Sequence, residues 1–131
     1  MIETRILNPS LLALLARVRH TNRIVIADAM FPSWPGLTEV DLSLVAGVPT
    51  VTQVLAAIAA TWKPGAAWMA REFHDHNDEA TRREFESALG AAPGVLMYEP
   101  HSELKARVPG STGLVRTGEM RIYTNVVLES R

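Results

Sequence analysis

The chain has 131 residues, 47% of them hydrophobic, and we expect residues 1–131 to form a single domain with its own core. Thirteen lysines and arginines stand against fourteen aspartates and glutamates, so the net charge is −1 and nucleic acid is not expected as a partner. The absence of cysteine excludes disulfides, thiol catalysis and cysteine-ligated zinc sites.

The first 20 residues contain an apolar run, but its flanks do not suit a secretory signal. Glu3 precedes the run, and Arg17, Arg19 and His20 follow it. No stretch reaches the ~18 to 20 uninterrupted apolar residues that span a bilayer. We therefore expect a cytoplasmic protein with no membrane partner.

A helix is predicted to begin after Asn8, which can cap free amides, with Pro9 preset for the first turn. Four leucines and a valine then form one apolar stripe, and the helix should end near Arg19. Residues 23–27, Arg-Ile-Val-Ile-Ala, have the pattern of a strand covered on both faces in a parallel sheet. Asp28 then lies at the exit of this strand.

The rest of the chain alternates between strand and helix patterns. Strands are expected over residues 38–47, 65–72, 94–99, 112–119 and 123–130, and helices over residues 49–62, 78–90 and 101–108. Such alternation predicts an α/β domain with a mostly parallel central sheet between helical layers.

The first candidate site residues are Asp28 and His20. In open α/β sheets, ligand clefts form beyond the carboxyl ends of the strands, and Asp28 has that position. An acid there can also be a helix cap or a turn residue. A histidine just after a helix can serve only to complement the helix dipole.

Two further pairs carry polar side chains at matching spacing. His101 and Lys105 are four apart and share one face of a short helix, which suits a polyhydroxylated or anionic ligand. Tyr123 and Asn125 are two apart and would share one face of a strand. Both pairs could equally be solvated or structural.

The run His-Asp-His-Asn-Asp, residues 74–78, offers several potential metal ligands. It lies at a polar junction before a helix, where Asn77 or Asp78 can be a cap, and a third ligand at a recognisable spacing is missing. There is also no nucleotide-binding glycine pattern. We therefore expect neither a metal nor a cofactor.

Taken in order, the motifs resemble those of the RbsD/FucU family of sugar mutarotases, which includes ribose pyranase and fucose mutarotase. The likeness runs from Leu7 to Leu128 and rests on His-Thr before an apolar strand and Asp28, then Gly-Val-Pro, His-x-x-x-Lys, Thr-Gly-Glu and Tyr-x-Asn. It implies a three-layer α/β/α sandwich. It also implies a ring-based homo-oligomer, typically a decamer, in which the Tyr-x-Asn segment reaches a neighbour's site.

The resemblance assigns His20 as the catalytic residue and implies that the monosaccharide is bound by Asp28, His101, Lys105, Tyr123 and Asn125. The implied reaction exchanges anomers, or pyranose and furanose rings, by moving protons between oxygens, for which the unperturbed histidine pKa of ~6.5 is suitable. We expect the strand to deliver Asp28 to a cleft that His20 borders.

The substrate is expected to be D-ribose, because His-x-x-x-Lys and residues 71–78 resemble the ribose branch of the family. L-fucose is the alternative, because Phe31 and Pro32 resemble the fucose branch. A monosaccharide-binding protein without turnover is the alternative from another functional class.

Overall fold

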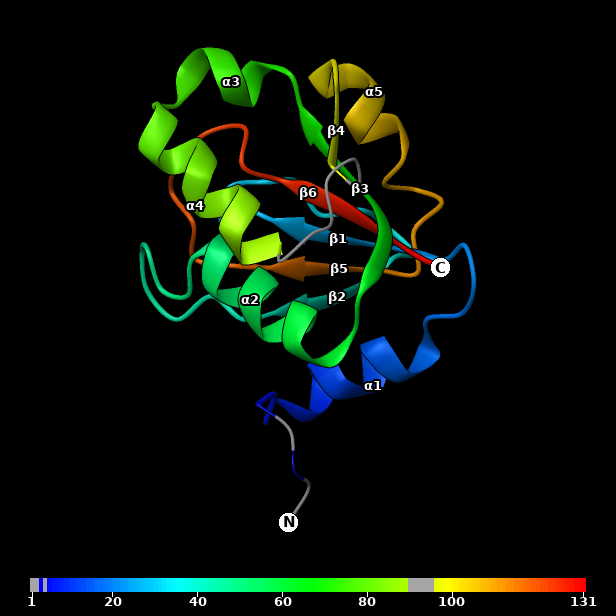
Figure 1. The fold of residues 1–131 in the computed structure, drawn as a ribbon. Helices are drawn as coiled ribbons and strands as arrows, with labels where there is room; N and C mark the ends of the chain where they lie inside the picture. The colour runs from blue at the N-terminus through cyan, green and yellow to red at the C-terminus, as the bar shows by residue number, and fades with distance from the viewer. Residues whose placement is uncertain (1–2, 4, 90–95) are drawn as a thin grey trace.

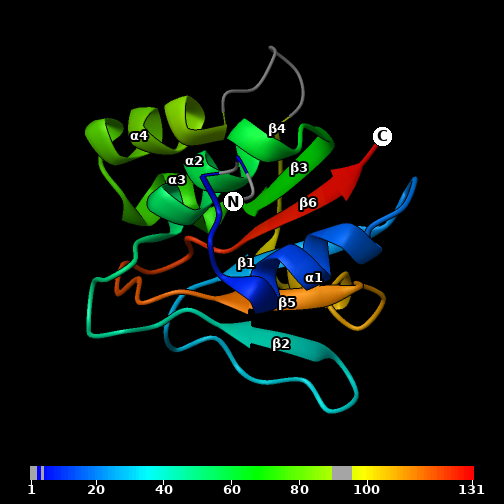
Figure 2. The same cartoon turned by 90° about the horizontal axis from the view of Figure 1, so that it is seen from below.

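A six-stranded sheet forms the centre of the molecule (Figure 1). The computed structural model describes residues 3, 5–89 and 96–131. The strands are β1 (Arg23–Ala27), β2 (Thr38–Asp41), β3 (Pro64–Ala70), β4 (Leu96–Glu99), β5 (Gly113–Arg116) and β6 (Val126–Ser130). Their order is β2-β5-β1-β6-β3-β4, and β6 lies between β1 and β3 (Figure 2). Strand β6 is antiparallel to both neighbours, and the other described pairs are parallel.

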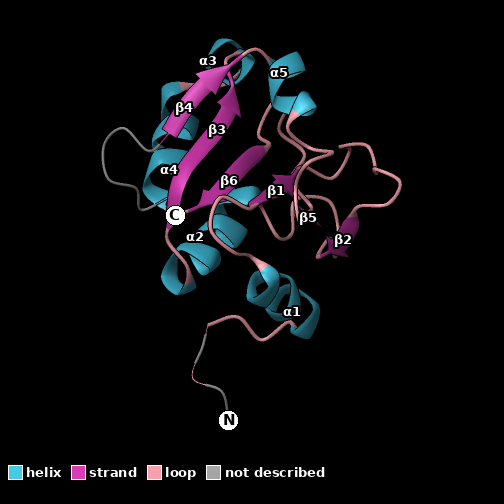
Figure 3. Ribbon diagram, turned by 90° about the vertical axis from the view of Figure 1, so that its right-hand side faces the viewer, coloured by secondary structure: helices cyan, strands magenta, loops and turns pink. Residues whose placement is uncertain are grey.

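Helices cover both faces of the sheet, which confirms the expected sandwich of α/β/α layers. They are α1 (Pro9–Arg17), α2 (Val51–Thr61), α3 (Glu72–His76), α4 (Glu79–Leu89) and α5 (His101–Ala106). Helices α1, α2 and α4 lie on one side of the strands and α5 on the other (Figure 3). None of the helices in the described part of the chain combines the length and the apolar character needed to cross a bilayer.

The alternating side chains of β1 show why both faces are apolar. Ile24 and Ile26 are fully buried in the cluster that contains the core residues of α1, α2 and α4. Val25 and Ala27 point the other way, into the cluster that contains Leu104 of α5. The sequence pattern of β1 is therefore that of a central strand with no solvated face.

The helix starts follow from local capping. Asn8 accepts a hydrogen bond from the amide of Leu11 at 2.9 Å, as predicted for α1. The helix ends at Arg17, two residues before the expected end, because Val18 already has extended backbone. Thr50 and Gln53 form a reciprocal capping box at the start of α2.

Several expected boundaries were wrong. Strands predicted over residues 38–47 and 112–119 are shorter, and the predicted end of the third strand is the start of α3, which the sequence did not reveal. The last strand begins at Val126, so Tyr123 and Asn125 precede it instead of sharing a strand face. The predicted helix end at residue 90 and strand start at residue 94 lie outside the described residues.

The sheet topology brings segments that are distant in the sequence together at one edge of the sheet, the edge formed by the carboxyl ends of the parallel strands. The five parallel strands all end at this edge, and β6 begins there because it runs the opposite way. Residues that follow β1 and β4 therefore lie at the same edge as those that precede β6.

Candidate functional site

A cavity of about 300 Å³ opens at this edge. It is lined by Asp28, Met30, Phe31, Pro32, His101, Ile122, Tyr123 and Asn125. The size is at the lower limit for small-molecule sites in proteins. Four of the six predicted site residues, namely Asp28, His101, Tyr123 and Asn125, thus meet around one cavity within one chain.

Asp28 and Asn125 are linked directly. The backbone amide of Asp28 donates to Asn125 Oδ1 at 2.8 Å, and Asn125 is only 2% exposed. The carboxylate of Asp28 accepts a hydrogen bond from the amide of Met30 at 2.9 Å, which closes a tight turn after β1. The turn therefore orients Asp28 at the wall of the cavity.

Arg116, at the end of β5, also stabilises the turn after β1. Its role was not predicted from the sequence. Its Nη1 donates to the carbonyl oxygens of Asp28 at 3.4 Å and Ala29 at 3.2 Å, and also to that of Phe31. Its Nη2 donates to Glu39 Oε1 at 2.9 Å, and this contact lowers the pKa of Glu39 below its ordinary value. The only signal in the sequence was a charged residue ending an otherwise apolar strand.

His101 is the first residue of α5 and is half-buried. Its amide donates to both carboxylate oxygens of Glu72, at 3.1 and 3.2 Å, which ties α5 to α3. Its Nδ1 is buried without a hydrogen-bond partner in the described part of the chain. Burial, and then the charge of Lys105, lower the pKa of His101, against the opposing effect of Glu72 and Asp28. The lowered pKa favours the neutral imidazole at pH 7, which is the form that can accept a proton.

Tyr123 lies between two imidazole rings. The ring centroids of Tyr123 and His101 are 5.2 Å apart in an edge-on arrangement, and those of Tyr123 and His76 are 5.0 Å apart with an interplanar angle of 34°. The backbone of Tyr123 is in the left-handed region, with a φ of +57°. This conformation explains why residue 123 does not extend β6.

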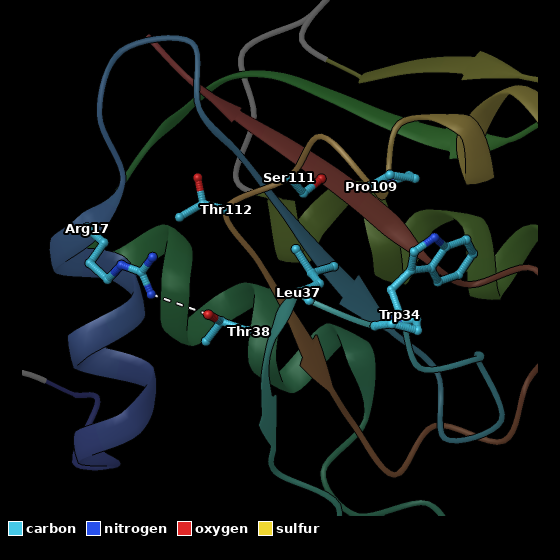
Figure 4. A pocket seen from close by; sticks show the side chains of 9 residues that line it. Arg17, Trp34, Leu37, Thr38, Pro109, Ser111 and Thr112 are labelled. Carbon is cyan, nitrogen blue, oxygen red and sulfur yellow. Dashed lines mark hydrogen bonds between the residues drawn. The ribbon is translucent and has the colours of Figure 1, made fainter.

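Lys105 is not among the residues that line the cavity. Its Nζ lies 5.9 Å from the centroid of the Trp34 ring, and that ring stacks on Phe31 at 5.7 Å. Trp34 lines a second hollow, of about 420 Å³, where β2 and β5 begin (Figure 4). In that hollow, Arg17 Nη1 donates to Thr38 Oγ1 at 3.3 Å. Lys105 is thus connected to the cavity only indirectly, because it lies over Trp34, which stacks on the cavity residue Phe31.

His20 lies at the opposite edge of the sheet, before β1 begins, where its Nδ1 contacts the carbonyl oxygen of Arg131. Strand β1, at ~3.3 Å per residue, separates the two edges by roughly 16 Å. The expectation that His20 borders the same cleft as Asp28 is therefore wrong for a single chain. Tyr123 and Asn125 line a cavity of their own chain, and that they reach a neighbour's site stays a prediction.

The histidines of residues 74–78 pack against aromatic rings. The ring of His74 lies edge-on to Tyr98 with centroids 4.2 Å apart, whereas His76 faces Tyr123. Among the residues that the structure describes, no group of three or more histidine, cysteine or acidic side chains is arranged to hold a metal ion.

Known proteins resemble the chain along nearly its whole length. The profile of the RbsD / FucU transport protein family matches residues 1–130. The D-ribose pyranase of Rhodopirellula baltica is 38% identical, over 99% of this chain and 97% of that protein, and the D-ribose pyranase of Geobacillus kaustophilus is 35% identical, over 99% and 93%.

Solved structures share the fold. Bacillus subtilis RbsD complexed with D-ribose superposes with a TM-score of 0.89 at 31% identity, covering 99% of this chain and 97% of that one. The fucose mutarotase from Streptococcus pneumoniae, in complex with L-fucose, superposes with a TM-score of 0.76 at 20% identity over 99% and 97% of the two chains. The second likeness concerns the fold alone.

Proposed function

We propose, because the chain belongs to the RbsD/FucU family, that it is an isomerase that exchanges D-ribose between its pyranose and furanose rings. The observation that carries the proposal is the meeting of Asp28, His101, Tyr123 and Asn125 around one cavity in a chain whose relatives are D-ribose pyranases. The similarity to an RbsD structure with bound D-ribose supports the choice of ribose.

The chemistry is a movement of protons with no redox step. A base removes the proton of the anomeric hydroxyl while an acid protonates the ring oxygen, so the bond between that oxygen and the anomeric carbon breaks and an aldehyde forms. A different hydroxyl then attacks the aldehyde carbon and loses its proton, and the carbonyl oxygen regains one. Groups that both give and take a proton near neutral pH accelerate each half of this cycle.

The cavity residues suit these tasks. The carboxylate of Asp28 can accept hydrogen bonds from sugar hydroxyls, and the amide of Asn125 and the hydroxyl of Tyr123 can give or accept them. His101 is a half-buried imidazole whose pKa is lowered, so it can accept a proton at neutral pH. Such fixed contacts hold a flexible polyol in one pose.

We further infer that the proton donor is His20 of a neighbouring chain. Because His20 and the cavity lie at opposite edges of the sheet, the amino edge of one chain must meet the carboxyl edge of the next to bring them together. Head-to-tail contacts of this kind form a ring when the rotation between neighbouring chains closes. A ring-based oligomer fits this arrangement, and the resemblance to the family implies a decamer.

An apolar surface beside the cavity supports such a contact. Large hydrophobic side chains on the loops at this edge are each more than half exposed, namely Met30, Leu44, Val45, Met120 and Ile122. Met30 and Ile122 line the cavity itself, and the other three line an adjoining hollow of about 280 Å³. An exposed apolar surface at the mouth of a polar site is typical of a subunit interface.

Exchange spectroscopy by NMR tests the activity. Saturating one ribopyranose anomeric signal should transfer saturation to ribofuranose signals faster with chelator-treated protein than without it. Acceleration with L-fucose but not with ribose would favour the fucose alternative. Binding of ribose without any acceleration would favour a non-catalytic binding protein.

Subunit mixing tests the shared site. His20→Ala and Tyr123→Ala proteins, each of low activity, should regain activity when unfolded and refolded together, because some interfaces would then pair an intact cavity with an intact His20. Light scattering should give a mass several times that of one chain. Mixed oligomers without regained activity would place each site within one chain.

A further inference from the structure

The backbone of Tyr123 is unusual for a residue with a bulky side chain. Its φ of +57° lies in the left-handed region, which non-glycine residues enter rarely and at a cost in free energy. Such a conformation persists only where the surrounding contacts enforce it, and it is often found at functional sites. The contacts that hold Tyr123 are therefore of interest.

The end of α3 supplies two of these contacts. Asn77 Nδ2 donates to the carbonyl oxygen of Ile122 at 3.1 Å, which fixes the peptide group directly before Tyr123. The preceding residue, His76, places its ring centroid 5.0 Å from that of Tyr123. Backbone and side chain of Tyr123 are thus held by consecutive residues.

Helix α3 is itself firmly anchored. Phe73 is fully buried, and its ring centroid lies 4.9 Å from that of Phe85 in α4. Asn77 Nδ2 also donates to the carbonyl oxygen of Phe73 at 3.2 Å, and the carbonyl oxygen of Asn77 accepts from Arg82 Nη1 at 2.8 Å. The support beneath Tyr123 is therefore connected to the core.

We propose that His76 and Asn77 are positioning residues that clamp Tyr123 in its sugar-binding orientation, an inference that rests on the proposed function. The clamp holds Tyr123 against His101, whose ring lies 5.2 Å away, so the two rings present a preformed wall to the cavity. Preforming the wall before the sugar arrives lowers the entropy cost of binding.

Loss of the clamp should weaken the binding of ribose more than it slows the chemical step. Without it, Tyr123 can leave the left-handed conformation, and ribose binds only to the fraction of molecules that retain the competent arrangement. An aromatic ring pair contributes energy that corresponds to about a 3- to 10-fold change in affinity. His76→Ala should therefore raise the ribose KM and Kd by about 3- to 10-fold and change kcat by less than about 2-fold.

Three further variants make the test specific. Asn77→Asp keeps the shape but removes the donor to Ile122, so it should raise KM in the same way. His76→Phe keeps a ring against Tyr123 and should restore KM to within about 2-fold of the wild type. His74→Ala, on the same short helix but facing Tyr98, is the matched control and should leave KM unchanged. Equal effects of His74→Ala and His76→Ala, or no effect of His76→Ala, would overturn the clamp.

A measurement without sugar separates the clamp from the proposed function. The chain has two tyrosines, so the ring protons of Tyr123 can be assigned by comparison with Tyr123→Phe. Wild-type protein should show nuclear Overhauser contacts from this ring to His76 and His101, and Asn77→Asp should weaken the contact to His101. An unchanged contact between the rings of Tyr123 and His101 in both Asn77→Asp and His76→Ala would disprove the clamp even if ribose is exchanged. Absence of ribose exchange with the contacts present would refute the function alone.

Discussion

The backbone amide of Asp28 and the side-chain oxygen of Asn125, 97 residues apart in the chain, are joined by a hydrogen bond of 2.8 Å. This bond connects the end of β1 to the segment that leads into β6. The two strands are neighbours in the sheet, so the bond continues their pairing past its last backbone contact.

Asn125→Ala should therefore reduce both stability and activity. The amide of Asp28 would lose its acceptor, and leaving such a group unpaired costs about 1 to 3 kcal/mol in the free energy of unfolding, measurable by urea denaturation. Ribose exchange should fall by about 10-fold or more, because two cavity groups are disturbed together.

Asn125→Asp keeps an acceptor for this bond but adds a charge. Residue 125 is only 2% exposed, so the new carboxylate would be buried beside that of Asp28, and stability should fall at neutral pH although the amide of Asp28 keeps its acceptor. Exchange should fall as well, since two negative charges would then lie beside the cavity. If Asn125→Ala were as stable as the wild type, the hydrogen bond between Asp28 and Asn125 would not contribute to stability.

His20→Ala should lower the exchange rate by about 10²- to 10⁴-fold if His20 is the proton donor, as proposed. The free energy of unfolding should be unchanged, because the residue is exposed at the end of the sheet. Added imidazole should restore part of the rate. A wild-type rate in this variant would transfer the catalytic role to His101.

His101 should make stability depend on pH in a predictable direction. Its pKa in the folded protein lies below the ordinary value because of burial and Lys105, so the unfolded chain binds the proton more readily. Above about pH 6.5 both states are neutral and this contribution does not change. As the pH falls from there to the folded pKa, stability is lost.

The comparison with His101→Gln isolates this contribution from that of the other histidines. The free energy of unfolding of the wild type, minus that of the variant, should decrease between pH 7.5 and pH 5.5. A difference that stayed constant, or increased, would contradict a lowered pKa.

Gly118→Ala should be strongly destabilising. A Cβ atom at this position would lie 2.4 Å from the carbonyl oxygen of Val48 and 2.6 Å from that of Val45, and neither backbone group can move easily. We expect the free energy of unfolding to fall by about 1 to 3 kcal/mol or more. Gly110→Ala is the matched control, because the nearest atom to its Cβ is 4.0 Å away. Similar stabilities of the two variants would argue against this packing.

Sequence reasoning succeeded where a local pattern determines the structure. The unbroken apolar run of β1 predicted a central strand, and Asn8 with Pro9 predicted the start of α1. The position of Asp28 beyond the carboxyl end of β1 predicted its place in a cavity. Each of these features depends on residues close together in the chain.

The failures concern features set by distant parts of the chain. No local signal shows that Tyr123 has a positive φ, since Asn77 and His76 enforce it from another element. Whether His20 lies near Asp28 depends on which edge of the sheet each occupies, and the length of β1 separates them. The role of Arg116 depends likewise on its contacts with the turn after β1.

The position of β6 has a consequence for how the chain folds as it is synthesised. This strand is the last of the six to be synthesised, yet it lies between β1 and β3, so before it is made only two parts of the sheet can pair, β2-β5-β1 and β3-β4. Domains fold as units, with amino-terminal parts available first. For this chain, the amino-terminal parts must wait for residues 126–130 before the sheet can close. Chains that end before residue 126 should therefore be far more sensitive to protease than chains that include β6.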